Sequence, residues 1–345
     1  IAYGSRKKRE LITSVSSIKA DDIKEIPAAS LETLLQGRMA GVGVNIQSGS
    51  PGGGGTNVAV RGYNSLWLDE AGGGDGSPLY VIDGVPVHSF TSPVTGTNTI
   101  AEIDPSTIES VEVLKDAASA AIYGSRAANG VILITTKKGQ EGSVYTSVRY
   151  EAVLSMPTRE IEVVDPINYM KMYNQALLAR NPDATPQYSV ERIERTGSPS
   201  YPSWVYPAND WYNIMFHDYS INHRAGLNMR GGSRLVQYYA SVNYVRDEGM
   251  LKTDRLNQFK CNIENNTFSF RTNLNIDLSA GIRLNINTSA NLDKYRGPYA
   301  DVSESYYLAY NASPVDFAPT YPADESSNWP HLRFGAVDQQ TVNPY

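Results

Sequence analysis

The residues best suited to binding chemistry lie in a glycine-rich stretch, "NSLWLDEAGGGDGSP", at residues 64–78. An exposed Trp67 could stack on a sugar ring while the carboxylates of Asp69 and Glu70 accept hydrogen bonds from its hydroxyl groups. The same carboxylates and that of Asp75 could instead hold a Ca²⁺ ion, which prefers oxygen ligands. In a third interpretation Trp67 only packs against neighbouring protein. The pattern leaves all three open.

A second aromatic cluster lies in "YPSWVYPANDWYN", residues 201–213. Trp204 and Trp211 could form a stacking platform for a ligand or anchor a protein partner. Tryptophan and tyrosine also gather at membrane surfaces, so an aromatic belt is the alternative. A contact to a partner or to the membrane surface fits the pattern better than direct ligand binding.

Catalytic and cofactor motifs are missing. The glycine-rich "SGSPGGGGTN" lacks the Gly-Lys-Ser/Thr that a phosphate-binding loop requires. There is no Gly-x-Ser-x-Gly or His-Glu-x-x-His motif, and the four histidines are scattered without ligand spacing. Cys261 stands alone, which excludes a disulfide framework. We therefore expect neither an enzyme nor a bound cofactor, with Ca²⁺ as the one metal to consider.

Composition and charge narrow the class of protein. The 345 residues are 41% hydrophobic and 19% charged, with a net charge of -6, and a chain of this length has room for two domains. The pI near 5.4 argues against nucleic acid, which needs a basic surface. No apolar run reaches the roughly 18 residues of a transmembrane helix. A transmembrane β-barrel remains compatible, because its apolar residues alternate with polar ones.

Residues 1–140 have the pattern of a mixed α/β domain. Ser30 is placed to cap a helix that buries an apolar face and stops near Gly37, and a short strand follows it. "LYVIDGVPV" predicts a tight hairpin turned at Asp83 and Gly84. Further on, the pattern predicts a helical turn, a strand over 111–115, a small-residue helix capped by Asp116, and a strand over 131–136.

From residue 143 the pattern changes to long strands with strict alternation of apolar and polar residues. The alternating runs cover residues 143–155, 219–230, 234–246, 268–278 and 282–293. Their length, and the asparagine, arginine and serine on the second face, favour a barrel with a water-filled lumen and a lipid-facing outer surface. A soluble β-sandwich with one solvated face is the alternative.

The connections between these strands are of two kinds. Residues 231–233 and 279–281 are tight turns, whereas the other connections are long, including a predicted helix that starts near Pro166. Short periplasmic turns and long extracellular loops are typical of outer-membrane barrels. Because five strands cannot close a wide barrel, we expect this sequence to be the amino-terminal part of a longer chain.

Four segments carry a resemblance to a known family. They are "LQGRMAGVGV", "GSPGGGGTNVAVRGYNSL", "PLYVIDGVPV" and "IESVEVLKDAASAAIYGSRAANGVILITTKKG". In this order they resemble the plug domain of the SusC-like (RagA-like) TonB-dependent outer-membrane transporters. The resemblance implies a mixed α/β plug domain at 1–140, followed at 141–345 by the first part of an antiparallel transmembrane β-barrel of about 22 strands. It places the chain in the outer membrane of a Gram-negative bacterium.

The resemblance also implies a function. Such transporters import oligosaccharides or oligopeptides, and a SusD-like surface lipoprotein captures the substrate. The TonB–ExbB–ExbD complex would pull on the tether before the plug, here Ile1, Ala2, Tyr3 and Gly4, which resemble the end of the stretch that holds the TonB box. Transporter–lipoprotein pairs commonly associate as dimers. A siderophore or cobalamin receptor, and a non-transporting barrel that serves as a scaffold for surface proteins, remain as alternatives.

Overall fold

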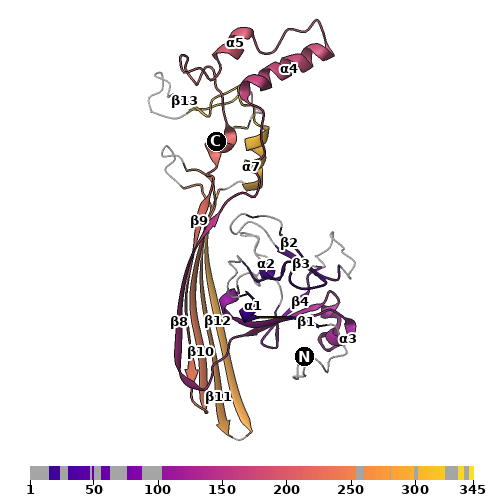
Figure 1. Cartoon of the computed structure of the whole chain (residues 1–345), viewed down its shortest axis with the longest axis vertical. Helices are drawn as coiled ribbons and strands as arrows, with labels where there is room; N and C mark the ends of the chain where they lie inside the picture. Colours follow the sequence, from indigo (N-terminus) through magenta and orange to yellow (C-terminus); the bar gives the residue numbers. More distant parts are fainter. Residues whose placement is uncertain are drawn as a thin grey trace. The chain divides into compact units, whose positions relative to one another are not determined.

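The computed structural model describes two compact units (Figure 1). The described residues are 15–23, 30–46, 49, 56–62, 76–87, 103–253, 260–279, 281–298, 302–322, 333–337 and 342–345. The first unit draws on residues 1–154, 221–249 and 264–296, and the second on 155–220, 250–263 and 297–345. The segments that connect the long strands therefore fold together as a unit of their own.

The first unit contains a small sheet of five short strands. Their order is β1 (Val15–Lys19), β6 (Ile108–Leu114), β7 (Val131–Thr136), β4 (Leu79–Ile82) and β5 (Val85–Val87). β4 runs parallel to β7, and the other neighbours are antiparallel. A separate hairpin joins β2 (Val42–Ile46) to β3 (Thr56–Val60). The strand predicted at 111–115 begins earlier, because the helical turn η2 covers only Pro105–Thr107.

The β4–β5 hairpin turns at Asp83 and Gly84 as predicted. Their φ angles are 49° and 89°, so both residues adopt the left-handed conformation that a two-residue hairpin turn requires. Asp83 also binds the end of β7. Its Oδ1 accepts a hydrogen bond from the backbone nitrogen of Thr136 at 2.9 Å, and its Oδ2 accepts one from the Thr136 hydroxyl at 2.6 Å. The turn is thereby fixed to a strand that lies far away in the sequence.

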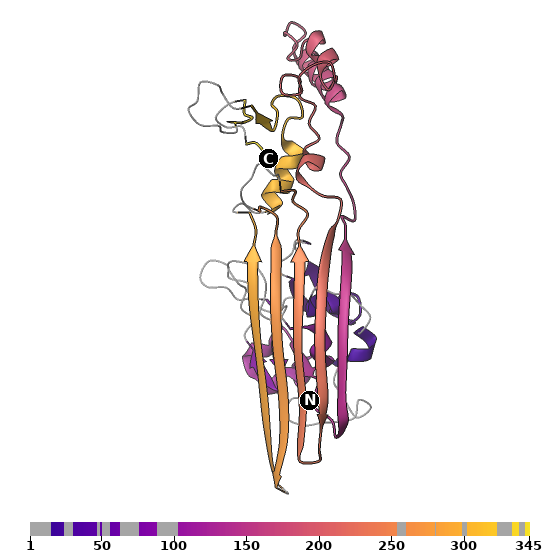
Figure 2. The same cartoon turned by 90° about the vertical axis from the view of Figure 1, so that its left-hand side faces the viewer.

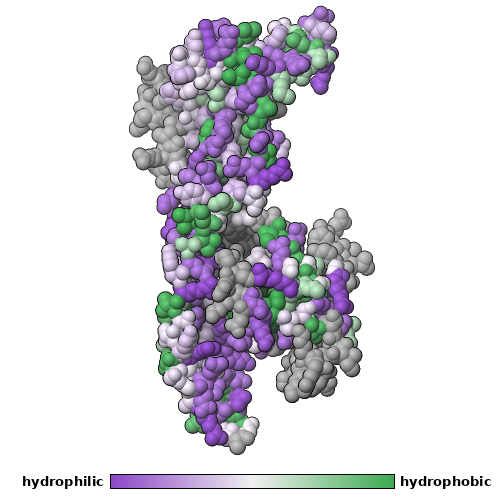
Figure 3. Space-filling view, viewed as in Figure 1, coloured by the Kyte–Doolittle hydropathy of each residue, from purple (hydrophilic) through white to green (hydrophobic). Residues whose placement is uncertain are grey.

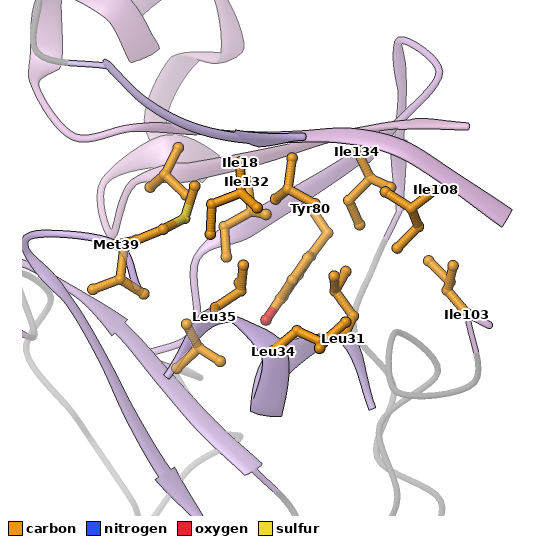
Figure 4. Close-up of a cluster of buried hydrophobic side chains, with 14 of the residues drawn as sticks. Ile18, Leu31, Leu34, Leu35, Met39, Tyr80, Ile103, Ile108, Ile132 and Ile134 are labelled. Carbon is orange, nitrogen blue, oxygen red and sulfur yellow. The ribbon is translucent and has the colours of Figure 1, made fainter. Parts of the chain in front are cut away.

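Helix α2 (Leu31–Leu35) packs its leucines into the core of the small sheet. Ser30 caps the helix as predicted, in a capping box with Thr33. The ring of Tyr80 extends from β4 toward the leucines of α2 (Figure 4). The most deeply buried apolar residues of this cluster are Leu31, Leu34, Leu35, Val60, Ile108, Val111, Val113, Ile132 and Ile134. This core holds the helix and the sheet together.

Glu32 lies within the same helix and is only 1% exposed. Burial raises the pKa of its carboxyl, whose two oxygens are buried and have no hydrogen-bond partner among the described residues. An acid whose folded-state pKa is raised stabilises the fold at low pH, and this contribution is lost as pH rises through the folded-state pKa. We expect Glu32→Gln to raise the melting temperature at pH 7. The decrease of the melting temperature as pH rises above about 4.5 should be smaller than in the wild type. Melting curves from pH 4 to 8 would test this, with an unchanged pH dependence as the contrary result.

The small-residue helix predicted after Asp116 is shorter than a regular helix. Asp116 caps α3 (Ala117–Ala120) by accepting a hydrogen bond from the Ser119 nitrogen at 2.8 Å. The chain then continues as the 3₁₀ segment η3 (Ala121–Ala127), which is kinked at Gly124 with φ of 65°. The positive φ at Gly124 prevents a continuous helix, and the predicted helix capped by Asp116 is confirmed. A further single turn, α1 (Ala20–Ile23), follows β1.

A long antiparallel sheet completes the first unit (Figure 2). Its strands are β8 (Gly142–Ser155), β9 (Ser220–Gly232), β10 (Val236–Glu248), β11 (Glu264–Ser279) and β12 (Ile282–Arg296), paired in sequence order. All five alternating runs are thus confirmed as strands. A tight turn at 233–235 joins β9 to β10, two residues later than predicted, because Gly231 and Gly232 belong to β9. β11 and β12 pair as neighbours, and the turn predicted between them at 279–281 includes residue 280, which lies outside the described residues.

The burial of this long sheet is the reverse of that of a soluble sandwich. The apolar face is exposed, with Val148 at 78% and Val242 at 51%, whereas Ser241, Asn243 and Asn273 on the polar face are at most 3% exposed. Hydrophilic residues cover much of the lower part of the surface seen in Figure 3, with scattered hydrophobic residues at its margin. The sandwich alternative needs a buried apolar face and is not supported.

The described residues of the second unit form four helices and a short hairpin. They are α4 (Pro166–Arg180), α5 (Val190–Arg195), α6 (Trp211–Met215), α7 (Val302–Asn311), β13 (Thr320–Tyr321) and β14 (Arg333–Phe334). The helix predicted from Pro166 is confirmed. Asp165 caps it by accepting hydrogen bonds from the nitrogens of Ile167 and Asn168, at 3.1 and 3.0 Å, and these bonds lower the pKa of its carboxyl.

Candidate functional site

The polar face of the long sheet forms a contact with the small sheet. Asn273 on β11 donates two hydrogen bonds from Nδ2, one to the Thr136 hydroxyl at 2.9 Å and one to the Lys137 carbonyl at 2.6 Å. Thr136 and Asn273 are 0% and 2% exposed. The segment after β7 also approaches β10 closely, because a Cβ atom at Gly139 would overlap the Tyr238 backbone. The two sheets therefore contact each other through polar side chains and through the backbone at Gly139.

A narrow polar cavity lies beside this contact. Residues 103–107 form one wall, and side chains of β10, β11 and β12 form the other, among them Asn243 and Arg271. Within the described part of the chain, the side-chain amide of Asn243 has no hydrogen-bond partner although the residue is 3% exposed. A polar cavity of this kind suits a bridging water molecule. The contact between the sheets is therefore not sealed by apolar packing.

No sequence motif marks Asn273 or Thr136 as a contact residue. Asn273 was one of many polar residues on an alternating strand, and Thr136 was the last residue of a predicted strand. No local signal distinguishes them, since their contact joins residues 137 positions apart. Asp83 was identified only as a turn residue.

The two tryptophans predicted in the first long loop have different environments. Trp211 is 3% exposed, its Nε1 donates to the Ser313 carbonyl at 2.9 Å, and its ring lies 5.4 Å from that of Phe317. A ligand could stack on this ring only if the surrounding core opened. Trp204 is 49% exposed and is free to contact a ligand, a partner or lipid.

Two positions from Trp204, Tyr206 joins Tyr201 and Arg195 in a cluster of aromatic and cationic groups. The guanidinium of Arg195 lies 4.8 Å from the centre of the Tyr201 ring and 5.7 Å from that of Tyr206. Its Nη1 also donates to the Tyr206 hydroxyl at 3.0 Å. That hydrogen bond and the charge of Glu191 raise the pKa of Arg195. These contacts link Arg195 to Tyr201 and Tyr206, which flank the exposed Trp204 in the sequence.

A larger ring cluster joins α6 and α7. Tyr212 lies 5.3 Å from Phe216 and 5.7 Å from Tyr310, and Tyr306 lies 4.8 Å from Tyr310, measured between ring centres. Burial, followed by the charge of Glu160, raises the pKa of the Tyr212 hydroxyl. Tyr306 and Tyr310 were not predicted to join an aromatic cluster, although the run "YYLAY" places them four residues apart on one helix face.

The other candidate residues lie outside the described residues. They are Trp67, Asp69, Glu70 and Asp75 of the glycine-rich loop, and Ile1, Ala2, Tyr3 and Gly4 of the tether. Across the residues that the structure does describe, no group of three or more His, Cys, Asp or Glu side chains is placed to bind a metal. No helix among the described residues has the length and apolar character needed to cross a membrane.

Comparison with known proteins identifies the part of the first unit that holds the small sheet. Residues 7–131 match the family model of the TonB-dependent receptor plug domain. Over 83% of its length the chain is 36% identical to a TonB-dependent receptor of Formosa agariphila, of which it covers 26%. Over 93% of its length it is 29% identical to the TonB-dependent receptor SusC of Bacteroides thetaiotaomicron, of which it covers 29%. The relatives are receptors and not enzymes, as the sequence predicts.

The fold resembles that of a solved importer. The chain superposes over 96% of its length on a structure of the RagAB peptide importer in its open-open state, with a TM-score of 0.71, and covers 37% of that chain. At 22% identity this likeness concerns the fold alone. The small sheet corresponds to a plug domain and the long sheet to part of a barrel that is not closed here. The chain belongs to the SusC-like TonB-dependent receptors, and the predicted resemblance is confirmed.

Proposed function

We propose that this chain is the plug and part of the barrel of a transporter that imports nutrients across the outer membrane of a Gram-negative bacterium. The observation that carries the proposal is the reversed burial of the long sheet, whose apolar face is exposed while its polar face contacts the small sheet. A lipid-facing wall around a plugged aqueous lumen requires this arrangement. A water-soluble domain would bury the other face.

We assign the plug to residues 1–140 and the opening part of the barrel, with its extracellular loops, to 141–345. The tight turns between the long strands would be periplasmic, and the second unit would be extracellular. The tether with Ile1 and Gly4 precedes β1, which is an edge strand of the small sheet. Strand addition beside such an edge is a way for TonB to attach, and the TonB–ExbB–ExbD complex would supply the energy.

The substrates we propose are oligosaccharides or oligopeptides, delivered by a SusD-like lipoprotein. Kinship with SusC supports such a partner, and the RagAB importer of similar fold is named for peptides. In the second unit the exposed Trp204 is a candidate contact for substrate or lipoprotein, and Trp67, Asp69 and Glu70 are candidates in the plug. For Trp211 we propose a supporting role in the core of the second unit, because its ring is buried.

An uptake panel tests this function. A strain lacking the full-length gene, and the same strain complemented, would be given labelled oligosaccharides, oligopeptides, ferric siderophores and cobalamin, with and without a proton-motive-force uncoupler. We expect uncoupler-sensitive uptake of an oligosaccharide or oligopeptide and copurification of a lipoprotein. If the complemented strain takes up only siderophore or cobalamin, the proposed substrate class is wrong. If it shows no energy-dependent uptake and surface proteins copurify, a scaffold function is favoured.

A further inference from the structure

Three side chains form a continuous hydrogen-bond relay between the long sheet and the hairpin turn of the small sheet. Asn273 Nδ2 donates to the Thr136 hydroxyl oxygen at 2.9 Å, and the Thr136 hydroxyl donates to Asp83 Oδ2 at 2.6 Å. Asp83 Oδ1 accepts from the Thr136 nitrogen at 2.9 Å. The relay ends on a carboxylate, which makes its last hydrogen bonds charge-assisted.

The direction of this relay is fixed. The Thr136 hydroxyl has a single proton, and a carboxylate can only accept, so that proton must be donated to Asp83. The free lone pairs of the hydroxyl can then accept only from a donor, which Asn273 supplies. Aspartate at position 273 would have nearly the same size but no proton to donate. Position 273 therefore discriminates between two side chains of almost identical shape.

The relay lies in the polar contact between the sheets and apart from the apolar core of the plug. Of its members, only Asn273 belongs to the long sheet, and its second hydrogen bond goes to the Lys137 carbonyl just beyond β7. A contact made of hydrogen bonds can separate and exchange its partners for water, whereas parting an apolar core exposes surface that water disfavours. The relay is thus suited to hold the plug reversibly.

We propose that Asn273 is a positioning residue of the barrel wall that holds the plug closed through Thr136 and releases it during import. This inference rests on the proposed function. Asn273 then controls the closed state of the plug, and other residues recognise the substrate. Loss of its two hydrogen bonds is expected to raise the fraction of open plugs about tenfold.

Single-channel recording of the full-length protein tests the closed state without any substrate. For Asn273→Asp we expect about tenfold more spontaneous openings, with the heat-dependent gel mobility of the folded barrel unchanged. Asn275→Asp is the matched control, because Asn275 lies two residues along the same strand on the same face. Equal opening frequencies in the two variants would overturn the proposal.

A second pair of variants guards against a folding defect at position 273. Thr136→Val removes the hydroxyl at constant shape and should raise openings like Asn273→Asp, whereas Thr136→Ser keeps the hydroxyl and should behave like the wild type. Thr136→Val also breaks the bond to Asp83 within the small sheet, so its effect supports the relay only if Asn273→Asp, which leaves that bond in place, raises the openings to a similar extent. If the valine and serine variants open equally often, the relay does not hold the plug.

Release during import is tested by a cross-link. Thr136→Cys with Asn273→Cys, in a full-length protein freed of Cys261 and any other cysteine, would be oxidised and given the imported substrate. We expect uptake to stop while substrate binding persists, and reduction to restore uptake. If a fully cross-linked protein takes up substrate at the wild-type rate, the contact between Asn273 and Thr136 does not need to separate during import, and that part of the proposal is wrong. If the wild type imports nothing, the proposed function fails, while the channel recordings still decide whether Asn273 holds the plug.

Discussion

Replacing Trp211 with alanine is expected to destabilise the second unit by about 3–5 kcal/mol, the range for removing a buried tryptophan. The indole is 3% exposed and packs in a cluster with Met215, Phe216 and Phe317. Its loss leaves a cavity and an unpaired Ser313 carbonyl. Hydrogen exchange of the α6 and α7 amides in the full-length protein would measure the effect.

Trp204→Ala is the matched control for this prediction. Trp204 is 49% exposed, so its removal should change stability by no more than about 0.5 kcal/mol. If Trp204 contacts substrate or lipoprotein, the variant should weaken that binding while exchange in α6 and α7 stays unchanged. Equal destabilisation by both replacements would contradict the distinction that the structure draws between them.

Leu34→Ala is expected to cost the plug about 2–5 kcal/mol. Leu34 is 1% exposed at the junction of α2 with the small sheet, and the cavity left behind would have little freedom to collapse because the other side chains of its cluster come from six strands. The amides of β6 and β7 should then exchange faster by a factor of roughly 30 or more.

The control for the plug is Ile122→Ala, which removes a similar apolar side chain that is 50% exposed. It should leave exchange in β6 and β7 within about twofold of the wild type. Unchanged exchange in Leu34→Ala would mean that the leucines of α2 do not support the sheet. A change confined to α2 would lead to the same conclusion.

Much of the local structure was predictable because short-range chemistry decides it. Asp83 and Gly84 form the hairpin turn because the two residues tolerate positive φ, and Ser30, Asp116 and Asp165 cap helices through bonds that reach only a few residues. The long strands followed from alternation alone, since each side chain points to the face opposite its neighbour's. The kink at Gly124 that ends the helical path after Asp116 also has a local cause, because glycine adopts positive φ easily.

The sequence by itself determined the plug-like domain, the long alternating strands and the family resemblance, because these reside in local patterns and ordered motifs. Only the tertiary structure decided that Trp211 is buried while Trp204 is exposed, although the two are seven residues apart in one aromatic run. It alone joined Asn273 to Thr136 and placed β4 parallel to β7. These are contacts between distant segments, and their partners are selected by the packing of the whole fold rather than by any pattern within reach of either residue.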